Sequence, residues 1–219
     1  MSGSLYETHV TVRCDGPAES ERLDRWAAAA GLKLTRIELA RGRMRVQPML
    51  TLTGSPTRAA AAADAGRVVA RLRADGFVPV RVKTESAPWA PEVPREPCAA
   101  PQYFEHHVKL RPAADAGLDA LAAVVVPHGA HLSWNARRVL GGGRHERFVT
   151  QRCRGVDAEG ARRALDALLA ELDGFEVVEV EREFVLHDSD LSVDDGWIED
   201  APVAFEEARR SQGAGPVLP

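Results

Sequence analysis

An internal repeat constrains this chain more than any other feature of its sequence. The segment that begins at Glu7 reads ETHVTV, and a segment of similar pattern, EHHVKL, begins 98 positions later at Glu105. The same spacing relates Asp75-Gly76-Phe77 to Asp173-Gly174-Phe175. A spacing that holds from one end of the chain to the other predicts two copies of one structural unit.

Each copy is predicted to contain a strand, a helix, two strands, a helix and a strand, in that order. Alternation of polar and apolar residues indicates the strands, and alanine-rich stretches that end at glycine indicate the helices. In the first copy we expect strands at 7–14, 32–39, 47–53 and 77–85, with helices at 20–30 and 55–74. In the second copy we expect strands at 104–111, 130–139, 147–154 and 175–185, with helices at 114–126 and 157–172.

This order of elements resembles the ferredoxin-like βαββαβ arrangement. The resemblance implies an α+β fold of two tandem ferredoxin-like repeats related by a pseudo-twofold axis, each an antiparallel sheet with helices on one face. The expected boundaries are 1–86 for the first repeat, 87–102 for a proline-rich linker and 103–187 for the second repeat. An acidic C-terminal extension with a frayed tail is expected at 188–219.

Composition excludes several classes of protein. The chain has 219 residues, 45% of them hydrophobic, which is enough for a sizeable core. Its net charge of −4 argues against nucleic acid as a partner, and the lack of a long apolar run predicts no membrane partner and a cytoplasmic location. Three cysteines (Cys14, Cys98 and Cys153) without a Cys-x-x-Cys spacing indicate neither a disulfide framework nor a zinc ribbon. A homodimer is left open.

One face of each expected sheet carries a row of ionisable side chains. Strand periodicity places Glu7 and His9 on this face in the first copy, and Glu105 and His107 on it in the second. Two such faces that meet across the pseudo-twofold axis would enclose a polar cleft between the repeats. An interface of this kind is a common place for a small-molecule site.

The two histidines are the main candidates for chemistry, because histidine titrates near neutral pH and each follows a glutamate by two positions. We predict that His107 is a general acid or base oriented by Glu105, and that His9 and Glu7 form its partner or degenerate half. The expected ligand is a small anionic metabolite that carries a phosphate or carboxylate group. Its binding residues are predicted to be Lys109, Arg111, Arg152, Thr11, Arg13 and Arg137.

Two short motifs resemble those of known enzyme families. The segment from His9 to Val12 is similar to the HxTx motif of the two-histidine phosphoesterases, and the second copy has Lys109 at the threonine position. This resemblance implies proton transfer by His9 and phosphate contact by Thr11. The segment from Glu105 to Lys109 resembles the ExExK strand of the triphosphate-tunnel enzymes, which implies a triphosphate or organophosphate ligand.

The cofactor and the class of function are left open by the sequence. Paired glutamate and histidine side chains, such as Glu105 with His107 or Glu7 with His9, suit a divalent cation but do not indicate one. The competing function is a non-catalytic protein-interaction or scaffold module that uses the open sheet face.

The acidic segment 188–199 partly matches a calcium-binding loop. Its sixth position is Val193, where such a loop needs glycine, and a strand rather than a helix precedes it. We therefore expect this segment to fold back and to anchor Trp197 and Ile198 on the core.

Overall fold

A computed structural model of the protein describes residues 5–97, 101–111, 118–135 and 146–198. The strands are β1 (Tyr6–Arg13), β2 (Lys33–Leu39), β3 (Val46–Thr53), β4 (Val78–Ser86), β5 (Tyr103–Arg111), β6 (Ala130–Asn135), β7 (Arg147–Cys153) and β8 (Glu176–Asp188). The helices are α1 (Pro17–Ala30), α2 (Arg58–Ala74), α3 (Leu118–Val125) and α4 (Ala158–Glu171), with short 3₁₀ helices η1 (Val126–His128) and η3 (Leu191–Asp194).

Local sequence signals explain where the helices begin and end. The side chains of Thr57 and Asp157 accept hydrogen bonds from backbone N–H groups in the first turns of α2 and α4. At the end of α1, Gly31 takes a left-handed conformation with φ of 67°, which a residue with a Cβ adopts at a cost. These boundaries lie close to those predicted from the sequence.

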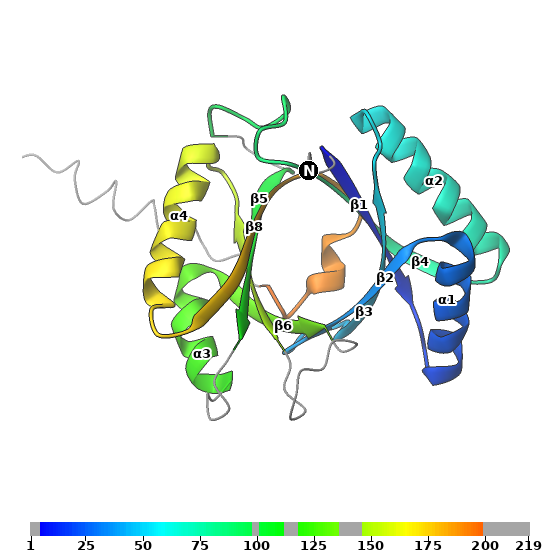
Figure 1. Cartoon of the computed structure of the whole chain (residues 1–219), viewed down its shortest axis with the longest axis horizontal. Helices are drawn as coiled ribbons and strands as arrows, with labels where there is room; N and C mark the ends of the chain where they lie inside the picture. Colours follow the sequence, from blue (N-terminus) through cyan, green and yellow to red (C-terminus); the bar gives the residue numbers. More distant parts are fainter. Residues whose placement is uncertain (1–4, 98–100, 112–117, 136–145, 199–219) are drawn as a thin grey trace, which may run out of the picture.

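The eight strands form one closed antiparallel barrel in the order β1-β3-β2-β6-β7-β5-β8-β4, with β4 paired again to β1. Figure 1 looks along this barrel and shows the helices outside its wall. The prediction of an α+β fold of two tandem ferredoxin-like repeats with open sheets is therefore wrong. So is the internal duplication about a pseudo-twofold axis that accompanied it.

Two strand pairings account for this correction. β2 pairs with β6, where Ile37 lies opposite Asn135, and β4 pairs with β8, where Ser86 lies opposite Phe184. An open sheet leaves a row of unpaired N–H and C=O groups along each edge strand, and closure into a barrel pairs groups of this kind, here through three residue pairs between β2 and β6 and four between β4 and β8. The closed barrel also removes the open sheet face that the scaffold hypothesis required.

The apolar core lies between the barrel wall and the helices, not inside the barrel. Val10, Val12 and Leu50 of the wall pack with Leu23 of α1 and Leu72 of α2. On the other half of the barrel, strands β5, β6 and β7 pack against α3 and α4 through a second buried cluster. Because side chains alternate across a strand, burial of one row under the helices directs the polar row inward.

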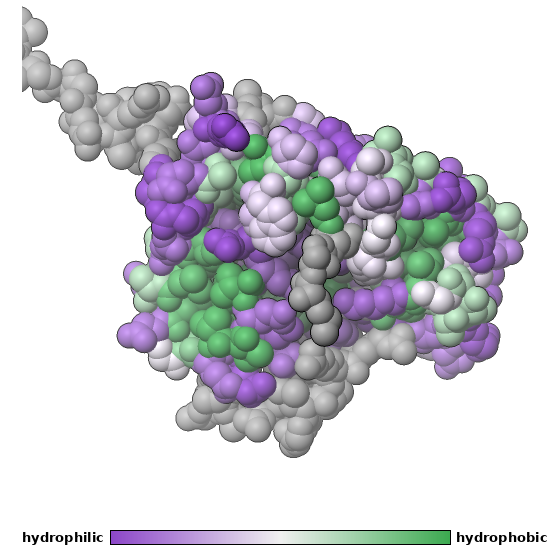
Figure 2. Space-filling model, turned by 45° about the horizontal axis from the view of Figure 1, so that its top comes forward, coloured by the Kyte–Doolittle hydropathy of each residue, from purple (hydrophilic) through white to green (hydrophobic). Residues whose placement is uncertain are grey.

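One stretch of the wall lacks this helical cover. Val177, Val178 and Val180 of β8 are exposed. Figure 2 shows an apolar area on the half of the molecule that carries α3 and α4. In the described part of the chain, no helix combines the length and apolar character needed to cross a membrane.

The segment that follows β8 folds back into one end of the barrel, where Figure 1 shows it inside the ring of strands. We call residues 191–197 the plug. Trp197 is buried, and its indole Nε1–H donates to the backbone oxygen of Leu132 at 2.9 Å. The predicted anchoring of Trp197 is therefore confirmed.

Replacing Gly42 with alanine should loosen the plug and lower the free energy of unfolding by about 1–3 kcal/mol. Gly42 has φ of 114°, and an added Cβ would lie 2.9 Å from Cβ of Trp197. Gly66→Ala is the matched control, because nothing lies within 4 Å of its added Cβ, and it should stabilise α2 by about 0.5–1 kcal/mol. Urea denaturation of both variants measures the difference, and equal effects would contradict the close approach at Gly42.

Candidate functional site

The barrel encloses a cavity of about 340 Å³ that is lined by side chains from all eight strands and from the plug. Strands β1, β4, β5 and β8 contribute mainly charged and histidine side chains. The opposite wall, from β2, β3, β6 and β7, contributes Thr35, Ile37, Met49, Ser133 and Phe148 among others. The volume lies in the range of small-molecule sites, and the two walls differ strongly in polarity.

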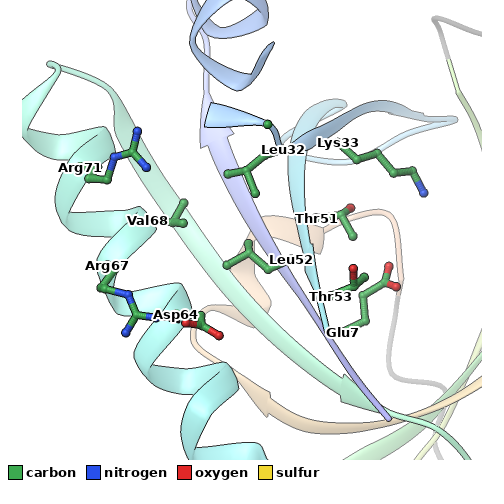
Figure 3. Close-up of a pocket in the computed structure, with 11 residues that line it drawn as sticks. Glu7, Leu32, Lys33, Thr51, Leu52, Thr53, Asp64, Arg67, Val68 and Arg71 are labelled. Carbon is green, nitrogen blue, oxygen red and sulfur yellow. Dashed lines mark hydrogen bonds and ion pairs between the residues drawn. The ribbon is translucent and has the colours of Figure 1, made fainter. Parts of the chain in front are cut away.

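The two ends of the barrel differ. Asp194 and Trp197 of the plug line the cavity at the end where Arg81 and Arg152 lie. Toward the other end the cavity shares Glu7 with two surface grooves of about 530 Å³ each. Figure 3 shows one of them beside α2, where Glu7, Lys33, Thr51 and Thr53 project from the strands. The cavity thus has a plug at one end and communicates with the surface at the other.

Buried ion pairs hold the plug in place. Asp194 is 2% exposed and accepts hydrogen bonds from Arg81 at 2.8 Å, from Arg152 at 2.7 Å and from Gln47 at 3.0 Å. Arg81 also binds both carboxylate oxygens of Asp188, at 2.8 and 2.5 Å. Burial alone would raise the pKa of Asp194, but the charges of Arg81 and Arg152 outweigh it, so this pKa lies below its ordinary value.

Glu105 is the centre of a second buried network. Its carboxylate, 1% exposed, binds the ammonium of Lys83, accepts a hydrogen bond from Arg152 at 2.7 Å and lies 3.2 Å from Nε2 of His107. Lys83 also lies 2.5 Å from Glu85. Burial opposes ionisation of Glu105, but these positive neighbours hold its pKa well below the ordinary value.

Both predicted histidines are held through both ring nitrogens. Nδ1 of His9 lies 3.2 Å from Thr51, and its Nε2 lies 3.1 Å from Glu85 and 3.3 Å from Glu7. His107 has the same pattern, with Nδ1 3.0 Å from Thr150 and Nε2 near Glu105 and Glu183. Each ring is thus fixed in orientation with its Nε2 directed at carboxylates.

These carboxylates decide the protonation of His107. Burial lowers the pKa of an imidazole, but hydrogen bonds and charges from Glu105 and Glu183 raise that of His107 to about 10. The pKa of Glu183 is raised to about 7, first by burial and then by the charge of Glu85. At neutral pH His107 therefore carries its proton, which suits a hydrogen-bond donor better than a general base.

We expect His107 to titrate near pH 10 and its neighbour His106 below 6.5 in the folded protein. Burial lowers the pKa of His106, whose ring faces Gln151 rather than a carboxylate. His107 and Glu183 bind protons more tightly in the folded chain than in the unfolded chain. The free energy of unfolding should therefore fall as pH rises from 4.5 to about 7 through Glu183, and from 6.5 to about 10 through His107.

Proton NMR of the imidazole Cε1–H groups measures both midpoints in one titration, and urea denaturation across pH measures the stability. His106 is the internal control, because both rings are measured in the same sample and differ in the groups that they contact. A midpoint for His107 at or below that of His106 would contradict the proposed ion pairs.

The structure brings together most of the residues predicted for the site. Of the predicted residues, those that line the cavity are Glu7, His9, Thr11, Glu105, His107, Lys109 and Arg152. Arg13 and Arg111 are not among its lining residues: Arg13 lies 3.5 Å from Asp15, and Arg111 pairs with Glu176. Arg137 falls outside the described residues.

The predicted anion-binding residues already have carboxylate partners within the chain. Lys109 pairs with Glu179, and Arg152 pairs with Glu105 and Asp194. Sequence reasoning missed the role of Asp194, because periodicity within a strand carries no signal for a segment that enters the barrel from its end. Arg81 and Lys83 were not among the predicted site residues either, although both belong to the buried networks.

The identification that rested on the two short motifs is wrong as well. The chain is a closed barrel and not a phosphoesterase fold. The first motif contributes a histidine bound to Glu85 and Glu7, and the second contributes a strand whose Glu105 and Lys109 pair with residues of the neighbouring strands β7 and β8. Short charged motifs of this kind arise wherever a polar strand row is neutralised by the strands beside it.

In the described part of the chain, Glu85, His107 and Glu183 place possible metal-ligand atoms within 4.8 Å of one another. The ammonium of Lys83 and the ring of His9 already lie against Glu85, at 2.5 and 3.1 Å. Nε2 of His107 also faces two carboxylates with its proton in place. This arrangement neutralises the carboxylates with the protein's own cations and does not favour a metal ion.

No protein-family model and no curated protein matches the chain. Among solved structures, it is similar to the small subunit of acetolactate synthase from Thermotoga maritima, at 12% identity and a TM-score of 0.30 over 81% of this chain and 92% of that one. It is similar to the regulatory subunit of aspartate kinase from Thermus thermophilus, at 14% identity and a TM-score of 0.33 over 77% and 92%. It is also similar to a heme-binding protein from Thermus thermophilus, at 12% identity and a TM-score of 0.27 over 84% of this chain and 92% of that one. Likenesses this low identify neither a family nor a function.

Proposed function

We propose that this protein binds a small molecule inside its barrel, and that binding rather than turnover is its function. The observation that carries the proposal is the cavity of about 340 Å³, with a plug at one end and a connection to surface grooves at the other. An eight-stranded barrel is wide enough either to be filled by its own side chains or to hold one small ligand. The cavity volume favours the second case.

The charged wall supports binding without catalysis. Most of its ionisable groups are held in fixed positions by partners within the chain, as His107 is held by Thr150, Glu105 and Glu183. A catalytic base needs a pKa near the working pH, whereas that of His107 is raised to about 10. Groups fixed in this way form a preorganised polar surface, which lowers the cost of ordering a site on binding.

A thermal-denaturation panel tests the proposal, with carboxylates, phosphates, amines, amino acids and uncharged polyols as separate classes. A ligand at 100 times its dissociation constant stabilises the folded state by about 2.7 kcal/mol. For a chain of this size that corresponds to a rise in Tm of roughly 5–10 °C. We expect at least one class to give such a shift.

A cavity-filling variant distinguishes binding inside the barrel from binding elsewhere. Thr35→Trp places an indole where Thr35 lines the cavity, and Glu38→Trp on the same strand is the control because Glu38 does not line it. The shift should vanish in Thr35→Trp and persist in Glu38→Trp. A panel without any shift, or a shift that survives in Thr35→Trp, would overturn the proposal.

A further inference from the structure

Two charged residues of the cavity differ from all its other ionisable residues. Lys33 of β2 and Glu181 of β8 line the cavity, and neither makes an ion pair or a side-chain hydrogen bond within the described part of the chain. Every other charged lining residue has a partner of opposite charge, as Arg81 has Asp188 and Lys109 has Glu179. One cation and one anion are thus left available to a ligand.

The closed strand order places these two residues on opposite walls. In the ring β1-β3-β2-β6-β7-β5-β8-β4, strands β2 and β8 are four positions apart in both directions. Lys33 also lines the groove beside α2, and Glu181 lines the groove at the end of β4. Figure 3 shows Lys33 projecting on the same side as Glu7 and Thr51, away from α2. A molecule that enters from this end meets the ammonium group on one side and the carboxylate on the other.

The charge balance of the cavity limits the net charge of its occupant. Apart from Lys33 and Glu181, the charged lining residues are already neutralised by partners of opposite charge within the chain, and the two that remain carry one charge of each sign. A ligand with a net charge would bring an uncompensated charge into this enclosed space, at a cost of desolvation. A ligand with one charge of each sign avoids that cost and engages both free residues.

Apolar side chains on the wall formed by β2, β3, β6 and β7 specify the remainder of the molecule. Ile37, Met49 and Phe148 line the cavity from β2, β3 and β7. Apolar surface that is removed from water against them contributes about 25 cal/mol per Å². The hydroxyl groups of Thr35 and Ser133 add only a few polar positions to this wall.

We propose that the ligand is a small zwitterion with an apolar body: its ammonium group binds Glu181, its carboxylate binds Lys33, and its apolar part lies against Ile37, Met49 and Phe148. The inference rests on the proposed function, because it names the class of molecule that the same cavity takes. It also replaces the expectation of an anionic ligand, since Lys33 is the one cation of the described lining that lacks a carboxylate partner.

Isothermal titration calorimetry tests the inference with α-, β- and γ-amino acids of apolar side chain, each compared with its deaminated and decarboxylated counterparts. For leucine these counterparts are 4-methylpentanoate and 3-methylbutylamine. The best zwitterion should bind at least tenfold more tightly than either counterpart. A counterpart that binds equally well, or a set without a binding zwitterion, overturns the inference.

Two variants show which residue binds which end of the ligand. The substituted residues, Lys33 and Glu181, are both exposed at the surface. Lys33→Met should weaken zwitterion binding at least tenfold and leave amine binding unchanged, whereas Glu181→Gln should weaken it equally and leave carboxylate binding unchanged. Arg25→Met and Glu171→Gln are the matched controls, because they remove exposed charges that do not line the cavity. Unchanged zwitterion binding in both test variants overturns the inference.

The failure of this inference and the failure of the proposed function give different results. If an uncharged, anionic or cationic member of the thermal panel binds and Thr35→Trp abolishes its shift, the cavity is a binding site but not for a zwitterion. If no class of molecule gives a shift that Thr35→Trp abolishes, the proposed function itself fails.

Discussion

Asp194→Ala should lower the free energy of unfolding by about 3 kcal/mol at neutral pH, and with it lower the Tm by roughly 6–12 °C. The carboxylate lies in the barrel between Arg81 and Arg152, at 2.8 and 2.7 Å. Without it, both guanidinium groups stay buried while each loses one of its two carboxylate partners. Removal of one member of a buried ion pair is costly because the desolvation of the remaining charge is no longer offset.

The neighbouring residue provides the control for this prediction. Asp195 has a side chain that is 61% exposed and lies 3.8 Å from that of Arg43, so Asp195→Ala should change the stability by less than about 0.5 kcal/mol. Urea denaturation measures the loss of stability in both variants. The slope of the unfolding free energy against urea concentration should not change, because the barrel remains folded. Equal effects of the two substitutions would show that the plug does not depend on its buried charge.

Glu105→Gln should cost a similar amount, about 3 kcal/mol, and should in addition lower the pKa of His107. The amide keeps the shape of the carboxylate but not its charge, so Lys83, Arg152 and His107 lose a shared negative partner inside the barrel. The midpoint of His107 should then fall from about 10 toward its ordinary range. NMR titration and urea denaturation of one variant measure the two effects.

Two comparisons test this explanation. Glu179→Gln removes the partner of Lys109, but Glu179 is 47% exposed, so the loss should stay below about 1 kcal/mol. The double variant Glu105→Gln with Lys83→Met removes a positive group as well as the negative one. It should therefore recover part of the stability that Glu105→Gln loses. If the double variant loses more free energy of unfolding than the two single variants lose together, the ion-pair explanation is contradicted.

Local patterns in the sequence were sufficient to place the elements and to orient their side chains. The alternation through Glu7 and His9, and through Glu105 and His107, predicted one polar face, and these four residues do line a common cavity. The prediction succeeded because alternation is a local property: two successive residues of a strand point to opposite sides whatever the strand pairs with.

The pairing of distant strands was decided only in the tertiary structure. β2 joins β6 and β4 joins β8 through backbone N–H and C=O groups, which are the same in every residue except proline and leave no pattern of side chains. The two polar faces consequently became the inside of one barrel. Insertion of Asp194 between Arg81 and Arg152 likewise depends on groups more than 40 residues apart, and their mutual neutralisation becomes visible only once the chain has closed around them.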